Sequence, residues 1–210
     1  MFRSSFVPYF INDIVDVFDD SNVYIKLFAD DVKLYLEIES NADHNELRDV
    51  INKIYDWSKT LQLRLASDKC EHCHISLSRI SQPSDYFVSD FMLPIVSIAR
   101  DLRVLIDSRL TFRDHIKSVV YRGHLRVMQI WRCFLCKDTD ILITAFTTYV
   151  RPLLEYCSPV SWSPKSVALV NDLESVQRRF TKRLLGFKLI MIVVLAWVLT
   201  VWNFVDYALI

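Results

Sequence analysis

The spacing of apolar residues changes partway along the chain and divides it into two parts. Up to about residue 110, short runs of β-branched and aromatic residues predict strands, as in 24–28, 32–35, 70–77, 86–89 and 102–107. From Phe112 onward the apolar residues recur every three or four positions, which predicts helices. We therefore expect an α+β protein in which an antiparallel sheet backed by helices precedes an all-helical bundle.

Two helices are predicted beside the strands of the first part. One covers about residues 9–18, where apolar residues lie at helical spacing behind Pro8. The other follows cap residues at 41–43 and runs to about Leu61. Its apolar positions fall on one face, which we expect to cover the sheet: Leu47, Val50, Ile51, Ile54, Trp57 and Leu61.

Three further amphipathic helices are predicted, at about 112–134, 142–154 and 167–184. Each has an apolar stripe along one face, so the three can share one core. The pattern ends near residue 187. The expected domains are therefore 1–110, 111–187 and a divergent tail at 188–210.

The tail contains an uncharged apolar stretch at 189–205, whose 17 residues lie at the lower limit of membrane-spanning length. Basic residues before it would keep its N-terminal side in the cytoplasm. Two other origins compete with a single transmembrane segment: an apolar helix that packs on the bundle, and unrelated sequence after a frameshift or a decayed end. We expect a helix with apolar residues on all sides, which would cause membrane association or aggregation.

Composition narrows the functional classes. The 25 basic and 25 acidic residues balance, so net charge gives no support to a stand-alone nucleic-acid binder. The chain has only two glycines, Gly123 and Gly186, although tight turns usually need more. Five unevenly spaced cysteines and no secretory signal indicate a reducing, intracellular setting.

Asp30 and Asp31 are the strongest candidate for chemistry. They lie between the two predicted strands 24–28 and 32–35, in a tight turn begun by Ala29. Adjacent carboxylates repel each other unless a cation neutralises them, and oxygen ligands suit magnesium. Such a pair fits metal-dependent phosphoryl or nucleotidyl transfer. The alternative is a surface turn in which the aspartates cap local backbone groups.

The stretch LFADDVKLY at 27–35 resembles the catalytic hairpin of reverse transcriptases, in particular those of non-LTR (LINE, jockey-like) retrotransposons. Further blocks resemble the same family in the same order along about residues 6–186. They are FINDI at 10–14, WS at 57–58 with Leu63, Leu65, Lys69 and Cys70 after it, RDLRV at 100–104, VRPLLEYCSP at 150–159, and LESVQRRFTKRL at 173–184.

The resemblance implies a fold and a reaction. The fold would be the later part of a polymerase palm followed by a thumb, without the front of the nucleotide-contacting motif and the strand that bears a third catalytic carboxylate. The reaction would be DNA synthesis on an RNA template from a DNA primer and dNTPs, with magnesium held by Asp30 and Asp31. An active member of the family would work in the nucleus.

The same resemblance implies roles for other residues. Lys69 matches a lysine thought to protonate the leaving pyrophosphate, a general-acid role. Taken alone, a lysine at a strand start is more typical of a solvated position. Arg100, Asp101, Leu102, Arg103 and Val104 match the primer-grip region. Arg103 there replaces a glycine, and Ala66 and Ser76 depart from the pattern around Lys69.

Arg178, Arg179, Lys182 and Arg183 form a basic cluster on the last predicted helix. Members four residues apart make a positive stripe that could neutralise phosphates without reading sequence. A solvated face that balances Asp172 and Glu174 explains the cluster equally well.

Two metal or cofactor signals are rejected. Residues 70–74 read C-x-x-C-H, a haem-attachment pattern, but on a strand the two cysteines would point to opposite faces. Cys133 and Cys136 could complete a four-cysteine zinc site, but neither pair lies in a turn-rich knuckle.

The replaced glycines and the incomplete carboxylate set favour a rival to the active enzyme. In that interpretation the chain is a catalytically dead transposon remnant that at most binds nucleic acid. We therefore expect no polymerase activity from the isolated chain.

Overall fold

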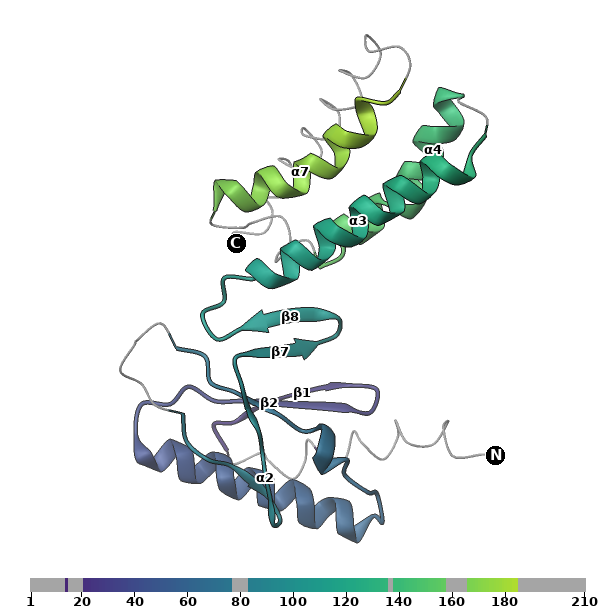
Figure 1. Ribbon diagram of the computed structural model, residues 1–210. Helices are drawn as coiled ribbons and strands as arrows, with labels where there is room; N and C mark the ends of the chain where they lie inside the picture. The colour runs from purple at the N-terminus through teal and green to yellow at the C-terminus, as the bar shows by residue number, and fades with distance from the viewer. Residues whose placement is uncertain (1–13, 15–20, 77–82, 136–137, 158–165, 185–210) are drawn as a thin grey trace. The chain divides into compact units, whose positions relative to one another are not determined.

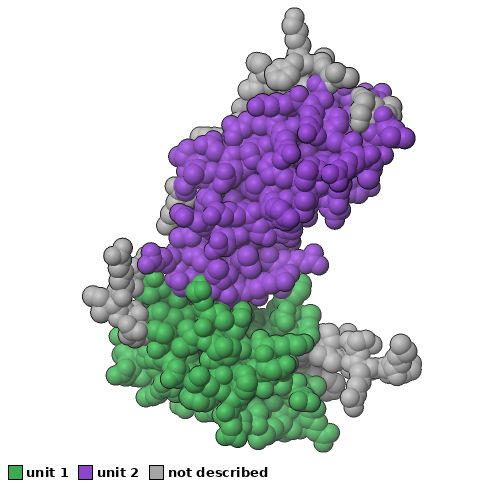
Figure 2. Space-filling view, in the orientation of Figure 1, with its two compact units in different colours: residues 1–97 green, residues 98–210 purple. Residues whose placement is uncertain are grey.

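The computed structural model describes residues 14, 21–76, 83–135, 138–157 and 166–184. The chain forms two compact units, Met1–Ser97 and Ile98–Ile210 (Figure 2). Helices and short strands are both present, so the α+β class is confirmed in this coarse form. The assignment of palm, thumb and tail to 1–110, 111–187 and 188–210 stays a prediction.

Unit 1 is built on the β1–β2 hairpin and helix α2 (Figure 1). Strand β1 (Tyr24–Phe28) pairs antiparallel with β2 (Asp31–Tyr35), and Phe28 pairs with Asp31 across a two-residue turn. Helix α2 (Asn41–Thr60) places its apolar stripe against the hairpin, as its periodicity predicts. The shared core contains Ile14, Val23, Val50 and Ile54.

The start of α2 differs from the expected one. The helix begins at Asn41 after the cap residue Ser40, and the Asp43 carboxylate accepts the backbone N–H of Ser40 at 2.7 Å. Glu46 is not part of this cap, which is formed by Ser40 and Asp43. It instead accepts the backbone N–H of Asn22 at 2.6 Å, which attaches the approach to β1 to the helix.

The expected single antiparallel sheet is not present among the described residues. The described strands form four separate two-stranded sheets, and one of them is parallel: β3 (His72–Cys73) with β6 (Ile95–Val96). The strand expected at 70–77 is reduced to β3, preceded by the short 3-10 helix η2 (Ser67–Lys69). The strand predicted at 86–89 is present as β4 (Phe87–Val88), which pairs antiparallel with the unpredicted strand β5 (Phe91–Met92).

Unit 2 begins with a hairpin and continues with helices (Figure 1). Strands β7 (Ile98–Asp101) and β8 (Val104–Asp107) pair across a two-residue turn. The strand predicted from Leu102 therefore starts two residues late, because Leu102 and Arg103 form the turn. Helix α3 (Arg113–Cys133) follows and matches the predicted 112–134.

The second predicted helix of the bundle is divided in two. Helix α4 (Thr139–Tyr149) ends before α5 (Arg151–Glu155), and Pro152 explains the break. Proline has no N–H to donate, and its ring collides with the carbonyl four residues earlier. Helix α7 (Val167–Thr181) is three residues shorter than the predicted 167–184.

The helices of unit 2 share one apolar core. Its members come from the four helices that the structure describes in this unit and include Val127, Val150 and Val176, each fully buried. Helix α3 lies so close to α5 and α7 that a methyl group on Gly123 would approach Leu154 Cδ2 of α5 to 3.1 Å and Val176 Cγ1 of α7 to 3.2 Å. One of the two glycines thus serves helix packing rather than a turn.

Several predicted elements cannot be compared with the structure. The helix at 9–18 lies outside the described residues except for Ile14, which is buried in the unit 1 core. The tail helix at 189–205, Cys136 and Gly186 also lie outside them. Within the described part, no helix is long and apolar enough to span a bilayer.

Candidate functional site

The tip of the β1–β2 hairpin holds the acidic pair. Ala29 and Asp30 form the two-residue turn, and Asp31 is the first residue of β2. The predicted hairpin turn is thus confirmed for Asp30, with Asp31 one position beyond it. Both aspartates are exposed. Their carboxylates can therefore meet a ligand from solvent.

The turn itself is strained. Ala29 has a φ of 54°, in the left-handed region that glycine adopts at no steric cost. For an alanine this conformation costs roughly 1–2 kcal/mol. The turn leaves both acidic residues exposed at the tip of an antiparallel hairpin.

The ligands at the tip suit a hard cation, but they are few. Two carboxylates provide oxygen ligands of the kind that magnesium prefers. Among the described residues, no group of three or more His, Cys, Asp or Glu side chains is arranged to hold a metal ion.

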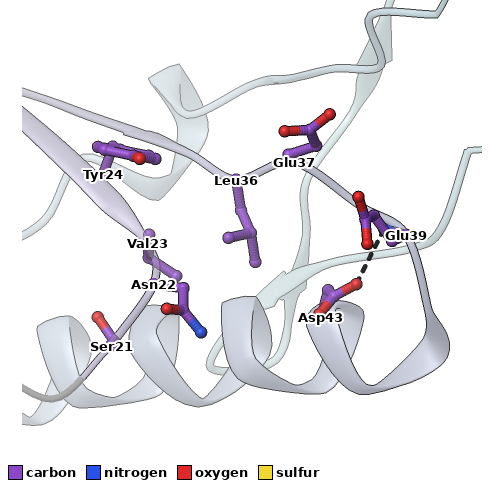
Figure 3. A pocket seen from close by; sticks show the side chains of 8 residues that line it. All are labelled: Ser21, Asn22, Val23, Tyr24, Leu36, Glu37, Glu39 and Asp43. Atoms are coloured by element: carbon purple, nitrogen blue, oxygen red, sulfur yellow. Dashed lines mark hydrogen bonds between the residues drawn. The ribbon is translucent and has the colours of Figure 1, made fainter.

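A cavity of about 440 Å³ lies at the other end of the hairpin (Figure 3). Glu37, Glu39 and Asp43 give it an acidic lining, together with Asn22. The Asp43 carboxylate accepts the backbone N–H groups of Glu39 and Ser40, which lowers the pKa of Asp43. This carboxylate is used to cap α2, so the cavity is less suited to a metal than its acidic lining suggests.

Lys69 is not at a strand start, contrary to prediction. It is the last residue of η2, where its backbone N–H donates to the Ala66 carbonyl at 2.9 Å. The side chain is exposed. Neither the cavity beside Asp43 nor a second one of about 410 Å³ beside Tyr55 is lined by Lys69 or by the acidic pair.

The five residues predicted as a primer grip form a hairpin end. Arg100 and Asp101 close β7, Val104 opens β8 and is buried, and Leu102 and Arg103 form the turn with φ of 44° and 69°. Both turn residues are left-handed, the arrangement that favours Asn-Gly. The Tyr156 hydroxyl donates to the Leu102 carbonyl at 2.9 Å and holds this turn.

The basic cluster lies at the C-terminal end of α7. Arg178 and Arg179 occupy the last turn, whereas Lys182 and Arg183 follow the helix, which ends at Thr181. All four are exposed. Glu174 approaches Arg178 to 3.7 Å, so part of the cluster is balanced within the helix. Cations at a helix C-terminus also stabilise the helix dipole, which offers a structural role.

Sequence reasoning missed a polar cluster in unit 1. The hydroxyl of buried Tyr86 lies 2.7 Å from His44 Nδ1, and its ring meets that of His72 edge-on, 4.8 Å between centroids. Burial lowers the pKa of His72. These residues are more than ten positions apart in the sequence, so no local pattern indicates them.

Comparisons with known proteins agree in part with the resemblance. The chain is 22% identical over 165 residues to a Drosophila melanogaster protein named "Probable RNA-directed DNA polymerase from transposon X-element", covering 76% of this chain and 18% of that protein. It is 31% identical over 83 residues to an uncharacterized protein of Caenorhabditis elegans, covering 40% of this chain and 41% of the relative.

The chain therefore spans less than half of the length of one relative and less than a fifth of the other. No family model matches it, and no solved structure matches it. The chain is distantly similar to a transposon reverse transcriptase.

Proposed function

We propose that this chain is part of an RNA-directed DNA polymerase of a non-LTR (LINE, jockey-like) retrotransposon. The observation that carries the proposal is the exposed pair Asp30 and Asp31 at the tip of a two-stranded hairpin. The distant similarity to a transposon polymerase supports it. Unit 1 would then belong to the palm, and the helices of unit 2 to the thumb.

Each candidate residue has a place in the reaction. The primer 3′ hydroxyl loses its proton to solvent as its oxygen bonds to the α-phosphorus of a dNTP, the bond from that phosphorus to the β-phosphate oxygen breaks, and pyrophosphate leaves. Asp30 and Asp31 would hold magnesium, which when bound neutralises the charge on the reacting phosphates. Lys69 would protonate the leaving pyrophosphate. Residues 100–104 would hold the primer, and Arg178, Arg179, Lys182 and Arg183 the duplex backbone.

A second candidate function is supported by the strained turns. A turn of two left-handed residues at Leu102 and Arg103 is unfavourable without glycine. Such a turn also presents a long arginine side chain where the family pattern has none. This favours a remnant that binds nucleic acid but has lost catalysis.

Primer extension tests whether the isolated chain is itself a working polymerase. From the isolated chain with magnesium, an RNA template and a DNA primer, we expect no extension, because two carboxylates alone do not complete a two-metal site. Extension that is lost in Asp30→Ala would show that the chain is a working polymerase. Extension that persists in Asp30→Ala would come from a contaminant.

A chimera tests the hairpin directly. Residues 24–35 would replace the catalytic hairpin of an active non-LTR polymerase, with Asp30→Asn and Asp31→Asn versions as matched controls. We expect magnesium-dependent extension in the first chimera and its loss in both controls. A folded chimera that binds template and primer but does not extend would contradict a catalytic role for this hairpin.

A further inference from the structure

The cavity of about 410 Å³ in unit 1 lies where three segments of the chain meet, and we call it the Tyr55 cavity. Helix α2 contributes Tyr55, Ser58 and Lys59, the residues after the helix contribute 63–65 and 67, and the β4–β5 hairpin contributes 88–91. The volume is within the range of small-molecule sites. No lining residue belongs to the β1–β2 hairpin, so a ligand here would not use the acidic tip.

A reversal of the chain after α2 builds one wall of the Tyr55 cavity. Gln62 is left-handed, with a φ of 56°, and the backbone N–H of Leu63 donates to the Ser58 carbonyl at 2.8 Å. The segment that follows therefore returns beside the last turn of α2, where Arg64 and Leu65 line the cavity.

One side of the Tyr55 cavity is apolar. Val88 belongs to a buried cluster of unit 1, and Leu65 packs against the same cluster. Phe91, the first residue of β5, is 41% exposed. Together these side chains offer an apolar surface on which a ring or a hydrocarbon chain can lie.

Three hydrogen-bonding groups meet on the polar side of the cavity. The Ser89 hydroxyl and the Lys59 ammonium donate hydrogen bonds to the Tyr55 oxygen, and these bonds lower the pKa of the Tyr55 phenol. The Lys59 ammonium also lies 4.2 Å from the centre of the Tyr55 ring. This cation–π contact holds the positive charge at the cavity.

The charges that line the Tyr55 cavity do not cancel. Lys59 and Arg64 are cations and Asp90 is an anion, and all three are exposed. Among the described residues, neither Lys59 nor Arg64 forms an ion pair with an aspartate or glutamate. The lining therefore carries one net positive charge beside an apolar surface.

We propose that the Tyr55 cavity binds a small monocarboxylate with an apolar body, such as an ionised aryl-substituted carboxylic acid. Arg64 and Lys59 would hold the carboxylate through charge-assisted hydrogen bonds, which are roughly twice as strong as neutral ones. The single net charge fits a monoanion, whereas a phosphate dianion would face Asp90 with charge left over. Binding here uses no metal and no nucleic acid, so the inference holds or fails independently of the proposed polymerase function.

The test follows the amide signals of the ¹⁵N-labelled full chain during titration with 3-phenylpropionate. Saturable shifts centred on residues 55–67 and 88–91 are expected in the millimolar range. Two probes each lack one half of this ligand: inorganic phosphate has no apolar body, and 3-phenylpropan-1-ol has no charge. Each should bind at least about tenfold more weakly, because the apolar contact and the charged hydrogen bonds each contribute that order of affinity.

Variants assign the charges individually. Lys59→Gln and Arg64→Gln should each weaken binding of 3-phenylpropionate about tenfold. Asp90→Asn should tighten it about two- to fivefold, because it removes a like charge at an exposed site. Lys53→Gln is the matched control, since Lys53 is an exposed lysine of α2 that does not line the cavity, and it should change nothing. Far-UV circular dichroism would confirm that each variant folds.

Several outcomes would overturn the proposal. No saturable shift with millimolar 3-phenylpropionate, or wild-type affinity in Lys59→Gln and Arg64→Gln, would remove the Tyr55 cavity as a carboxylate site. An equal loss in Lys53→Gln would reduce the effect to general surface charge. Weaker binding in Asp90→Asn, or tighter binding of phenylalanine than of 3-phenylpropionate, would mean that the cavity recognises an ammonium group as well, against the monocarboxylate assignment.

Discussion

The β1–β2 hairpin of unit 1 and the helices of unit 2 use their apolar residues in opposite ways. In unit 2, Val127, Val150 and Val176 are fully buried in one core. In the hairpin, Tyr24 and Phe28 are mostly exposed beside two aspartates and two lysines. Buried apolar area is what stabilises a fold, whereas exposed aromatic residues beside charges indicate binding. The comparison therefore places stability in the core of unit 2, and it is one basis on which we propose a functional role for the hairpin of unit 1.

The largest effect should come from emptying the helical core. Leu142 is 1% exposed, and Leu142→Ala removes its contacts and leaves a cavity. We expect a loss of about 2–5 kcal/mol in the free energy of unfolding of unit 2. Phe28→Ala, in the hairpin, should change stability by less than about 0.5 kcal/mol, as an exposed site does. Urea titration followed by hydrogen exchange of α4 and β1 measures both, and similar losses would erase the distinction.

A smaller loss of stability is expected from a substitution at Gly123, where the helices are in close contact. Gly123→Val would press a branched side chain into Leu154 and Val176, and overpacking of this kind costs about 1–3 kcal/mol. Gln129→Val is the matched control, since Gln129 is exposed on the same helix. Equal stability of the two variants in urea titration would mean that α3 can move away from α7 freely.

Relief of strain in the β7–β8 turn should raise the stability of unit 2 rather than lower it. Arg103→Gly removes the side chain from a left-handed residue, at the price of a more flexible unfolded chain. We expect a net gain of roughly 1 kcal/mol in the stability of unit 2. The control is Arg109→Gly, at an exposed residue without a left-handed φ, which should not stabilise. A gain in both variants would show that backbone strain is not the cause.

Mild acidification should have the smallest effect on the free energy of unfolding. Burial lowers the pKa of His115 and His124 in unit 2 and of His72 in unit 1. Each histidine therefore binds protons more weakly in the fold than in the unfolded chain, so stability is full above pH 6.5 and falls below it. At pH 6 a histidine of ordinary pKa is about three-quarters protonated in the unfolded chain, which limits the loss from each histidine to about 0.8 kcal/mol.

The two units should differ in their response to mild acidification, and in unit 2 the response should appear at β8. His115 Nδ1 accepts the backbone N–H of Leu105 at 3.3 Å, and protonation of that nitrogen would break the bond between α3 and β8. We expect hydrogen exchange at β8 to accelerate between pH 7.5 and 6, after correction for the intrinsic rate. His115→Gln should remove this pH dependence, and a dependence that persists would assign it to another group.

The periodicity of apolar residues was sufficient to predict those helices and strands that are determined by residues close in sequence. The stripe of α2 and the apolar face of α3 repeat within single turns, so both helices were predicted close to their observed bounds. The alternation in β1 and β2 likewise indicated the hairpin with Asp30 in its turn. The coarse fold class and the candidate tip are therefore readable from sequence.

Features that depend on distant residues were not predicted. The parallel pairing of His72 with Ile95 needs a partner more than twenty positions away, and the expected strand 70–77 therefore did not reveal it. The turn at Leu102 and Arg103 lacks the glycine that usually marks such a turn, so the strand was predicted through it. The break between α4 and α5 at Val150 has a cause that is visible in the sequence, Pro152. The spacing of apolar residues alone did not indicate it.

The most direct test of the central claim is where a divalent metal binds. Titration of the ¹⁵N-labelled chain with Mn²⁺ should broaden the amide signals of residues 29–32 first, and Mg²⁺ should reverse the broadening. The variant with Asp30→Asn and Asp31→Asn should lose this effect while its other signals stay unchanged. Broadening centred on Glu37, Glu39 and Asp43, or unaltered in the double variant, would contradict the assignment of the hairpin tip as the metal-binding site.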